Sequence, residues 1–228
     1  AHVLRCFEDD DVTHVANRVD PVDDAQTIDT ELMLADLDSV EKRLAANVKR
    51  IRAGDKEAVQ QQKLLEAVKA LLEDGRPARE LEVDDEDAKA FRMLQLLTSK
   101  PILYVSNVGE DDAATGNELS ARVAEMAEAQ GAAHVVISAA IEAEVAQLDD
   151  EERTAFLDDL GLEESGLDRL IRSGYGLLHL ITYFTAGPKE ARAWTIPAGY
   201  RAPQAAGAVR TAVANTAALG AKAAMVGE

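Results

Sequence analysis

Hydrophobic and polar positions change their spacing several times along the chain. Short apolar runs at 3–7, 102–105 and 134–137 predict buried strands, because a strand covered on both faces carries few polar side chains. Helical patterns separate these runs, with apolar residues at every third or fourth position. Strands that alternate with helices are typical of an α/β fold with a doubly wound parallel sheet, and we predict this fold class for most of the chain.

Two long helical patterns lie between the first two predicted strands. The first is expected to begin near residue 27, capped by Asp29 or Thr30, after turn residues at 19–24. Its apolar positions are Ile28, Leu32, Leu34, Leu37, Val40, Leu44 and Val48, and those of the second are Val59, Leu64, Leu65, Val68, Leu71 and Leu72. Only a short turn at 52–55 separates the two patterns, which predicts an antiparallel helical hairpin. Such a hairpin is either a structural arm or a partner-binding element.

The remaining segments predict further helices and a β-hairpin. An acidic run at 81–87 is expected to form a solvated first turn rather than a metal site. The helix that follows it has an apolar face of Ala90, Phe91, Leu94 and Leu97, and further helices are predicted at 117–130, 148–160 and 166–178. Strand patterns at 180–185 and 191–197 surround a Gly187-Pro188 turn. The pattern thus changes from α/β to a small β-rich module near residue 173.

Composition and charge narrow the classes of function. Of 228 residues, 24 are basic and 42 are acidic, which gives a net charge of −18. A chain this acidic is poorly suited to coat nucleic acid through phosphate contacts, and no sequence-specific DNA binding is expected. The single cysteine, Cys6, excludes an internal disulfide, and we expect a small buried strand residue rather than a reactive thiol. No apolar stretch approaches the roughly 20 residues of a membrane span and no signal peptide is visible, which together suggest a cytoplasmic protein without a membrane partner.

Two loops that leave predicted strands carry the candidate chemistry. Ligands of open α/β sheets bind beyond the carboxyl ends of the strands, so Asn107–Glu110 and the turn at 138–140 should lie close together. An Asn amide can pair with the N6/N7 edge of adenine, and Gly109 is expected to allow tight curvature beside a flat base. Ionised Glu110 has only acceptors, and adenine offers it an amino group but no second hydrogen, because N1 of adenine carries a lone pair. The turn at 138–140 can lend backbone amides and small side chains to the other face of a base.

Each of these loops is a weak signal when taken alone. By itself, Asn107–Glu110 is more simply explained as a strand-end turn followed by acidic residues, whereas both loops at successive strand ends favour a base pocket. Ser138 lacks a glycine-flanked elbow for nucleophilic catalysis, and Trp194 is expected in the core rather than as a stacking platform. The four histidines are not spaced like metal ligands, so we expect structural roles for His2, His14, His134 and His179.

Five longer segments of the sequence carry a family resemblance. They lie at 3–9, at 29–38, at 107–110 (Asn-Val-Gly-Glu), at 138–144 (Ser-Ala-Ala-Ile-Glu-Ala-Glu) and at 180–206. The last of them contains the strings Thr-Tyr-Phe-Thr-Ala-Gly and Arg-Ala-Trp-Thr-Ile-Pro. In this order the segments resemble the Obg-like ATPase (YchF) family of P-loop proteins. The resemblance covers about residues 1–207 and is specific, because several long strings agree in order.

The resemblance implies a fold, an activity and a partner. The fold would be a Ras-like nucleotide-binding domain at 1–20 and 98–172, an inserted helical hairpin or coiled coil at 21–97, and part of a β-rich TGS domain at 173–228. The activity would be ATP hydrolysis with Mg²⁺, with GTP bound more weakly because Asn-x-x-Glu replaces the Asn-Lys-x-Asp of GTPases. Ribosome association is the usual partnership of the family. By position, the residues around the base would be Asn107, Val108, Glu110, Ser138 and Ala139.

The sequence departs from the pattern of the family in two respects. It contains no Gly-x-x-x-x-Gly-Lys-Ser/Thr motif, so the ligands of the phosphates and of Mg²⁺ are expected outside this chain. We therefore interpret the chain as a fragment without the N-terminal Walker A and switch segments, inactive by itself, and we assign no catalytic residue and no metal ligand within it. The Ala-rich tail at 209–228 does not follow the family. The alternative is a non-catalytic ribosome- or protein-binding module that retains only the base-side half of the pocket.

Overall fold

The computed structural model describes residues 1–8, 19–186 and 191–208. The chain divides into two compact units, Ala1–Leu170 and Ile171–Glu228. None of the helices in the described ranges is both long enough and apolar enough to cross a bilayer. The predictions for most of the acidic segment after Phe7, for His14, for the Gly187-Pro188 turn and for the tail at 209–228 lie outside the described residues.

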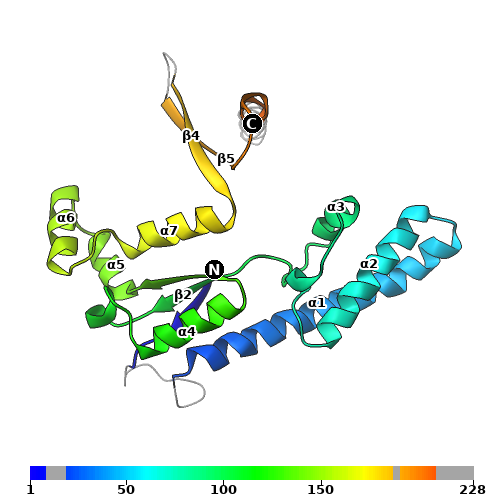
Figure 1. Cartoon of the computed structure of the whole chain (residues 1–228), viewed down its shortest axis with the longest axis horizontal. Helices are drawn as coiled ribbons and strands as arrows, with labels where there is room; N and C mark the ends of the chain where they lie inside the picture. Colours follow the sequence, from blue (N-terminus) through cyan, green and yellow to red (C-terminus); the bar gives the residue numbers. More distant parts are fainter. Residues whose placement is uncertain (9–18, 187–190, 209–228) are drawn as a thin grey trace, which may run out of the picture. The chain divides into compact units, whose positions relative to one another are not determined.

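A three-stranded parallel sheet forms the centre of the first unit (Figure 1). Its strands are β1 (His2–Arg5), β2 (Leu103–Asn107) and β3 (Ala133–Ile137), in the order β1-β2-β3. In the register of the sheet, Val3 lies opposite Val105, and Val105 lies opposite Val135. The prediction of a mixed α/β fold with a parallel sheet is therefore confirmed.

One face of this sheet packs against α4 (Glu118–Ala129) and the start of α1 (Pro21–Arg52). Asn117 caps α4, because its Oδ1 atom accepts from the backbone N–H of Ser120 at 3.0 Å. The Nδ2 atom of Asn117 also donates to the carbonyl oxygen of Cys6 at 2.8 Å, which fixes the start of α4 at the end of β1. Cys6 is fully buried, as predicted, and burial raises the pKa of its thiol. The buried residues on this face are Leu4, Cys6, Ala25, Tyr104, Val108, Val123 and Ala127.

Helix α1 begins six residues earlier than the pattern at 27 predicts. Pro21 occupies its first turn, where a missing backbone N–H costs nothing, and Asp20 accepts from the N–H of Asp23 at 3.3 Å. The interpretation of 19–24 as a turn, with a cap at Asp29 or Thr30, is therefore wrong. Thr30 lies inside the helix, and its hydroxyl donates to the carbonyl oxygen of Gln26 at 2.8 Å.

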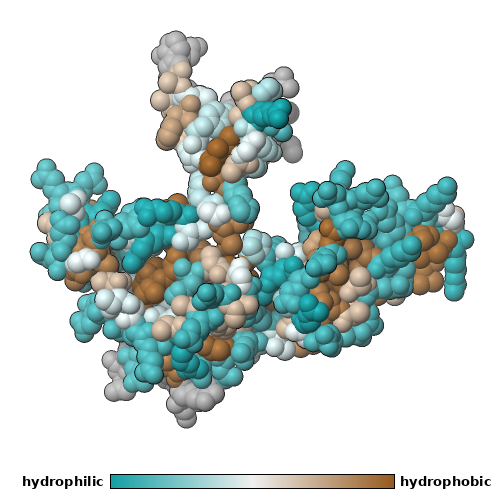
Figure 2. Space-filling model, in the orientation of Figure 1, coloured by the Kyte–Doolittle hydropathy of each residue, from teal (hydrophilic) through white to brown (hydrophobic). Residues whose placement is uncertain are grey.

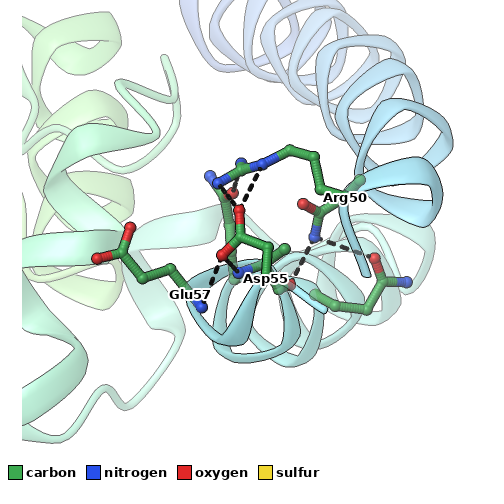
Figure 3. A network of polar contacts seen from close by, with 7 residues as sticks. Arg50, Asp55 and Glu57 are labelled. Carbon is green, nitrogen blue, oxygen red and sulfur yellow. Dashed lines mark hydrogen bonds and ion pairs between the residues drawn. The ribbon is translucent and has the colours of Figure 1, made fainter. Parts of the chain in front are cut away.

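Helices α1 and α2 (Lys56–Glu73) lie side by side (Figure 1). In the turn between them, Asp55 accepts from the backbone N–H groups of Glu57 and Ala58 and from the guanidinium of Arg50, 2.7 Å away at Nη2 (Figure 3). The hydrogen bond from Ala58, followed by that from Arg50, holds the pKa of Asp55 below its usual value. Gly54 has a φ of +86°, a backbone conformation that glycine adopts without strain.

The apolar pattern of this helix pair is only partly buried. Val40, Leu64, Leu65, Val68 and Leu72 form a core together with Ala78, Leu94 and Leu96. The helix predicted after the acidic run at 81–87 ends before its expected apolar face is complete: α3 (Asp85–Met93) ends before Gln95, whose φ is +51°, so Leu96 rather than Leu97 turns inward. Hydrophobic residues remain visible on the surface of this region in Figure 2. Among the exposed positions are Ile28, Leu34, Val48, Val59, Met93 and Leu97.

A buried carboxylate fastens α1 to the segment that enters β2. Asp36 is 3% exposed, and its two oxygens accept from the backbone N–H groups of Leu97 and Thr98, each at 2.8 Å. The hydroxyl of Thr98 donates to the same carboxylate at 2.7 Å and accepts from the N–H of Ala78 at 3.0 Å. Asp36 therefore joins α1, the short helix η1 (Ala78–Glu80) and the segment before β2.

Four shorter helices complete the first unit and lead out of it. They are η2 (Glu110–Asp112), α5 (Ala139–Val145), α6 (Asp150–Asp159) and α7 (Gly166–Leu177), the last of which spans the boundary between the two units. A small core under α5 and α6 consists of Ala113, Ile141, Val145, Leu157 and Leu162.

The second unit contains an antiparallel ribbon of β4 (Leu180–Ala186) and β5 (Ala191–Pro197). Tyr183 lies opposite Trp194. The indole N–H of Trp194 donates to the hydroxyl of Thr185 at 2.8 Å, and the guanidinium of Arg192 lies 4.9 Å from the centre of the indole ring. Trp194 is half-buried, so it belongs to the packing of the ribbon. These contacts account for a small β-rich module after α7.

Candidate functional site

The two predicted loops meet at the carboxyl edge of the parallel sheet. Asn107 is the last residue of β2, and Ala139, which follows β3, is the first residue of α5. The Oδ1 atom of Asn107 accepts from the backbone N–H of Ala139 at 2.8 Å. A side chain of one loop is thus bound to the backbone of the other, and the two form one joined surface.

This hydrogen bond occupies the Oδ1 atom of Asn107 and leaves its Nδ2 atom available to a ligand. In the part of the chain that the structure describes, no protein group bonds to Nδ2 of Asn107. The residue is half-buried, so its two remaining N–H groups lie at the edge of the sheet with limited freedom. Such a donor suits a ring nitrogen that carries a lone pair, such as N7 of a purine.

The next two residues hold the loop in place. Val108 is 3% exposed, packs its side chain into the core under α4, and donates its N–H to the carbonyl oxygen of Ile137 at 2.9 Å. Gly109 has a φ of −64°, which any residue adopts. The backbone therefore does not require glycine at this position, contrary to the expectation of tight curvature. A Cβ atom at Gly109 would find nothing within 4 Å, and this position is open above the loop.

Glu110 follows as an exposed carboxylate at the start of η2. Its side chain accepts no hydrogen bond from any group within the described ranges. Asp111 and Asp112 come directly after it, so the loop ends in three consecutive acidic residues. A carboxylate here can accept from an amino group and repels phosphate.

The structure places Ser138 differently from Ala139. Ser138 is 2% exposed, and its hydroxyl has no hydrogen-bond partner among the described residues. Ala139 is exposed, but its N–H is already bound to Asn107. The second loop therefore offers a small apolar surface at its edge rather than a free amide at Ala139. The contacts of both residues with a base remain predictions.

Sequence reasoning missed one residue that supports this surface. The carboxylate of Glu142, in α5, accepts from the N–H groups of Gly166 at 2.6 Å and Leu167 at 3.0 Å. These N–H groups belong to the first turn of α7, where no carbonyl of the same helix is available. Because 24 residues separate Glu142 from Gly166, no local pattern in the sequence predicts the pair.

A hollow of about 370 Å³ lies beside the Asn107–Glu110 loop, between the end of β1 and the start of α4. Its lining includes the carboxylates of Glu8, Glu110, Asp111, Asp112 and Glu118. The negative charges of these carboxylates repel a triphosphate. The hollow therefore suits only the uncharged part of a nucleotide. In residues 1–8, 19–186 and 191–208, no group of three or more His, Cys, Asp or Glu side chains is arranged to hold a metal ion.

Comparison with known proteins agrees with this architecture. The YchF-GTPase_C family model, described as a protein of unknown function, matches residues 180–218. The chain is 48% identical over 212 residues to the "Ribosome-binding ATPase YchF" of Bacillus subtilis and 50% identical over 210 residues to that of Haemophilus influenzae. Each match covers 92% of this chain and 58% of the relative, so the chain spans somewhat more than half the length of these relatives.

A solved structure shows the same fold. The Schizosaccharomyces pombe YchF GTPase matches with a TM-score of 0.79 and 32% sequence identity, over 92% of this chain and 57% of that one. The resemblance that the ordered sequence segments carry is thereby confirmed. With a parallel sheet that fits this structure and about half of its residues identical to the bacterial relatives, the chain belongs to the YchF family.

Proposed function

We propose that this chain forms the base-recognising part of an ATP site, in a protein that hydrolyses ATP and associates with the ribosome. The observation that carries the proposal is the hydrogen bond from the N–H of Ala139 to Oδ1 of Asn107. It joins two loops at the edge of the sheet where ligands of α/β folds bind. The curated relatives are named ribosome-binding ATPases, which supports ATP hydrolysis and ribosome association for the full-length protein.

The hydrogen-bonding groups of the surface favour adenine over guanine. The Nδ2 atom of Asn107 can donate to N7, which both purines share, and the carboxylate of Glu110 can accept from the N6 amino group of adenine. Guanine carries the O6 acceptor at the equivalent position and needs a donor there. The N–H of Ala139 is already engaged by Asn107 and does not serve O6.

The chain itself supplies the base side of the pocket. Its sequence contains no Gly-x-x-x-x-Gly-Lys-Ser/Thr motif, and the hollow beside Glu110 is lined by carboxylates. We assign the triphosphate and the Mg²⁺ that accompanies it to residues of the full-length protein outside this sequence. When bound, Mg²⁺ would neutralise charge on the phosphates during hydrolysis.

A competition titration tests the choice of base. ATP and GTP are titrated against a fluorescent ATP analogue bound to the full-length protein with Mg²⁺. We expect ATP to compete at least about tenfold more effectively, since one hydrogen bond lost and one left unpaired cost about 1.4 kcal/mol or more. Equal or tighter binding of GTP would contradict the adenine assignment and would agree instead with the name of the S. pombe relative, a GTPase. If neither nucleotide binds, the alternative of a non-catalytic ribosome- or protein-binding module is favoured.

The distribution of charge supports the ribosome as a partner. Residues 171–228 contain six of the 24 basic residues and only two of the 42 acidic residues, so this part carries +4 and the remainder carries −22. A ribosome presents a dense array of RNA phosphates, which attract the basic part and repel the acidic part. Arg192 and Arg201 are exposed in the second unit.

Reversal of charge in the second unit is expected to weaken ribosome association. In the full-length protein, the double variant Arg192→Glu and Arg201→Glu should bind purified ribosomes about tenfold or more weakly, with a shallower dependence on salt. Co-sedimentation at several salt concentrations measures this. The matched control reverses two exposed cations of the first unit, Lys42 and Arg76, and should change binding by less than about threefold. Equal losses in the two double variants would contradict docking through the second unit.

A further inference from the structure

We propose that Glu142 is a positioning residue for the base pocket: it holds the Ala139 turn in place by anchoring α5 to the first turn of α7. The inference rests on the proposed function, because it assigns Glu142 to the site where Asn107 and Ala139 meet. Glu142 is not proposed to touch the nucleotide.

The anchor is a carboxylate bound to two backbone N–H groups. One oxygen of Glu142 accepts from Gly166 at 2.6 Å, and the other accepts from Leu167 at 3.0 Å. Hydrogen bonds to an ionised acceptor are stronger than neutral ones, and the N-terminus of a helix favours negative charge. Glu142 is half-buried, which reduces competition from water.

The anchor acts on a short helix that begins at the base-facing turn. Helix α5 has seven residues, and its first residue is Ala139, which donates to Asn107. Glu142 lies three positions further on, and its N–H bonds to the carbonyl oxygen of Ser138 at 3.0 Å. A shift of Glu142 therefore moves Ser138 and Ala139 with it, because a single helical turn has little freedom to bend between them.

Close packing at Gly166 limits where the anchor can sit. A Cβ atom at Gly166 would lie 2.8 Å from Oε1 of Glu142 and 2.9 Å from Cγ2 of Ile137, both closer than normal contacts. The start of α7 is thus pressed against α5 on one side and the end of β3 on the other. Substitution of Gly166 by alanine must displace at least one of these two elements.

The test compares two ligands in the full-length protein. ATP contacts the base side and the phosphate side of the site, whereas inorganic tripolyphosphate contacts only the phosphate side. Glu142→Gln keeps the size of the side chain but places an amide N–H₂ against one of the two N–H donors. We expect its affinity for ATP to fall about tenfold and its affinity for tripolyphosphate to change less than about twofold. Isothermal titration with each ligand measures both.

Two further variants complete the design. Glu144→Gln removes the same charge from an exposed position of α5 and should leave both affinities unchanged. Gly166→Ala strains the anchor from its other side and should lower ATP affinity in the same way. The double variant Glu142→Gln, Gly166→Ala should lose less ATP-binding free energy than the sum of the two single losses, because both substitutions disrupt the same contact between α5 and α7.

The outcomes separate the inference from the function on which it rests. An unchanged ATP affinity in Glu142→Gln overturns the positioning role and leaves ATP binding intact. Equal losses for ATP and tripolyphosphate also overturn it, because they indicate general damage to the fold. A wild-type protein that binds tripolyphosphate but gains nothing from the adenosine of ATP overturns the proposed base recognition itself.

Discussion

In the full-length protein, Asn107→Ala is expected to weaken ATP binding about 100-fold. The substitution removes the proposed donor to N7 and the acceptor that holds Ala139 at 2.8 Å. Each hydrogen bond contributes about 0.5–1.5 kcal/mol, and two together approach the roughly 2.7 kcal/mol that corresponds to 100-fold. The N–H of Ala139 becomes available to a keto oxygen, so the preference for ATP over GTP should also narrow. Titration with both nucleotides measures the two effects.

A second substitution at the same position separates these roles. Asn107→Asp retains an oxygen for the N–H of Ala139 but replaces the Nδ2 donor by an acceptor that opposes the lone pair of N7. ATP affinity should therefore fall as in Asn107→Ala, whereas amide hydrogen exchange at Ala139 should stay slow only in Asn107→Asp. Unaltered ATP binding in both variants would refute base recognition by Asn107. Affinity for tripolyphosphate, which lacks a base, should remain within about twofold in each and is the internal control.

Asp36→Asn is expected to lower the free energy needed to open the contact between α1 and the segment before β2 by about 3 kcal/mol. The carboxylate of Asp36 accepts three hydrogen bonds from Leu97 and Thr98 at 2.7–2.8 Å in a site that is 3% exposed. An amide group in its place presents N–H₂ to at least one of these donors, which then remains buried without an acceptor. Hydrogen exchange of the backbone at 94–98 measures the change at the site itself.

Asp38 provides the matched control for this prediction. It lies two residues further along α1, but its side chain is 64% exposed and pairs with Lys42 at the surface. Asp38→Asn should change the same free energy by less than about 0.5 kcal/mol, because an exposed i,i+4 ion pair contributes little. If Asp36→Asn had an equally small effect, the carboxylate would not fasten α1 to the segment before β2.

Elements with local signals at both ends are predicted most accurately from the sequence. Helix α4 is expected at 117–130 and is found at Glu118–Ala129, because Asn117 and Ser120 form a reciprocal cap within four residues. The parallel arrangement of the sheet follows from apolar runs separated by helical patterns. The predicted start of α1 is wrong, because Pro21 fits a turn but suits a first helical turn equally well.

Burial along the hairpin is predicted less well. Spacing identifies Ile28 and Leu34 as part of an apolar face, yet they are 40% and 60% exposed, whereas the charged Asp36 is buried. A helical pattern identifies one face, but the partners decide which part of that face is covered. The partners of Asp36 lie 61 and 62 residues away, at Leu97 and Thr98.

The residues of the candidate site can be chosen from the sequence, but their arrangement cannot. Residue type and position at strand ends are enough to single out Asn107, Glu110 and the turn at 138–140. The tertiary structure alone shows that Asn107 bonds to Ala139, that Val108 and Ser138 are buried, and that Glu142 anchors α5.

The sequence by itself therefore determined the fold class, most helices and strands, and the family, because periodicity, caps and ordered motifs depend on residues close together in the chain. Tertiary structure decided which groups at the edge of the sheet remain available to a ligand. The reason is physical: a donor or acceptor is free only if no distant part of the chain satisfies it, and the partners of Asn107, Glu142 and Asp36 lie 24 to 62 residues away.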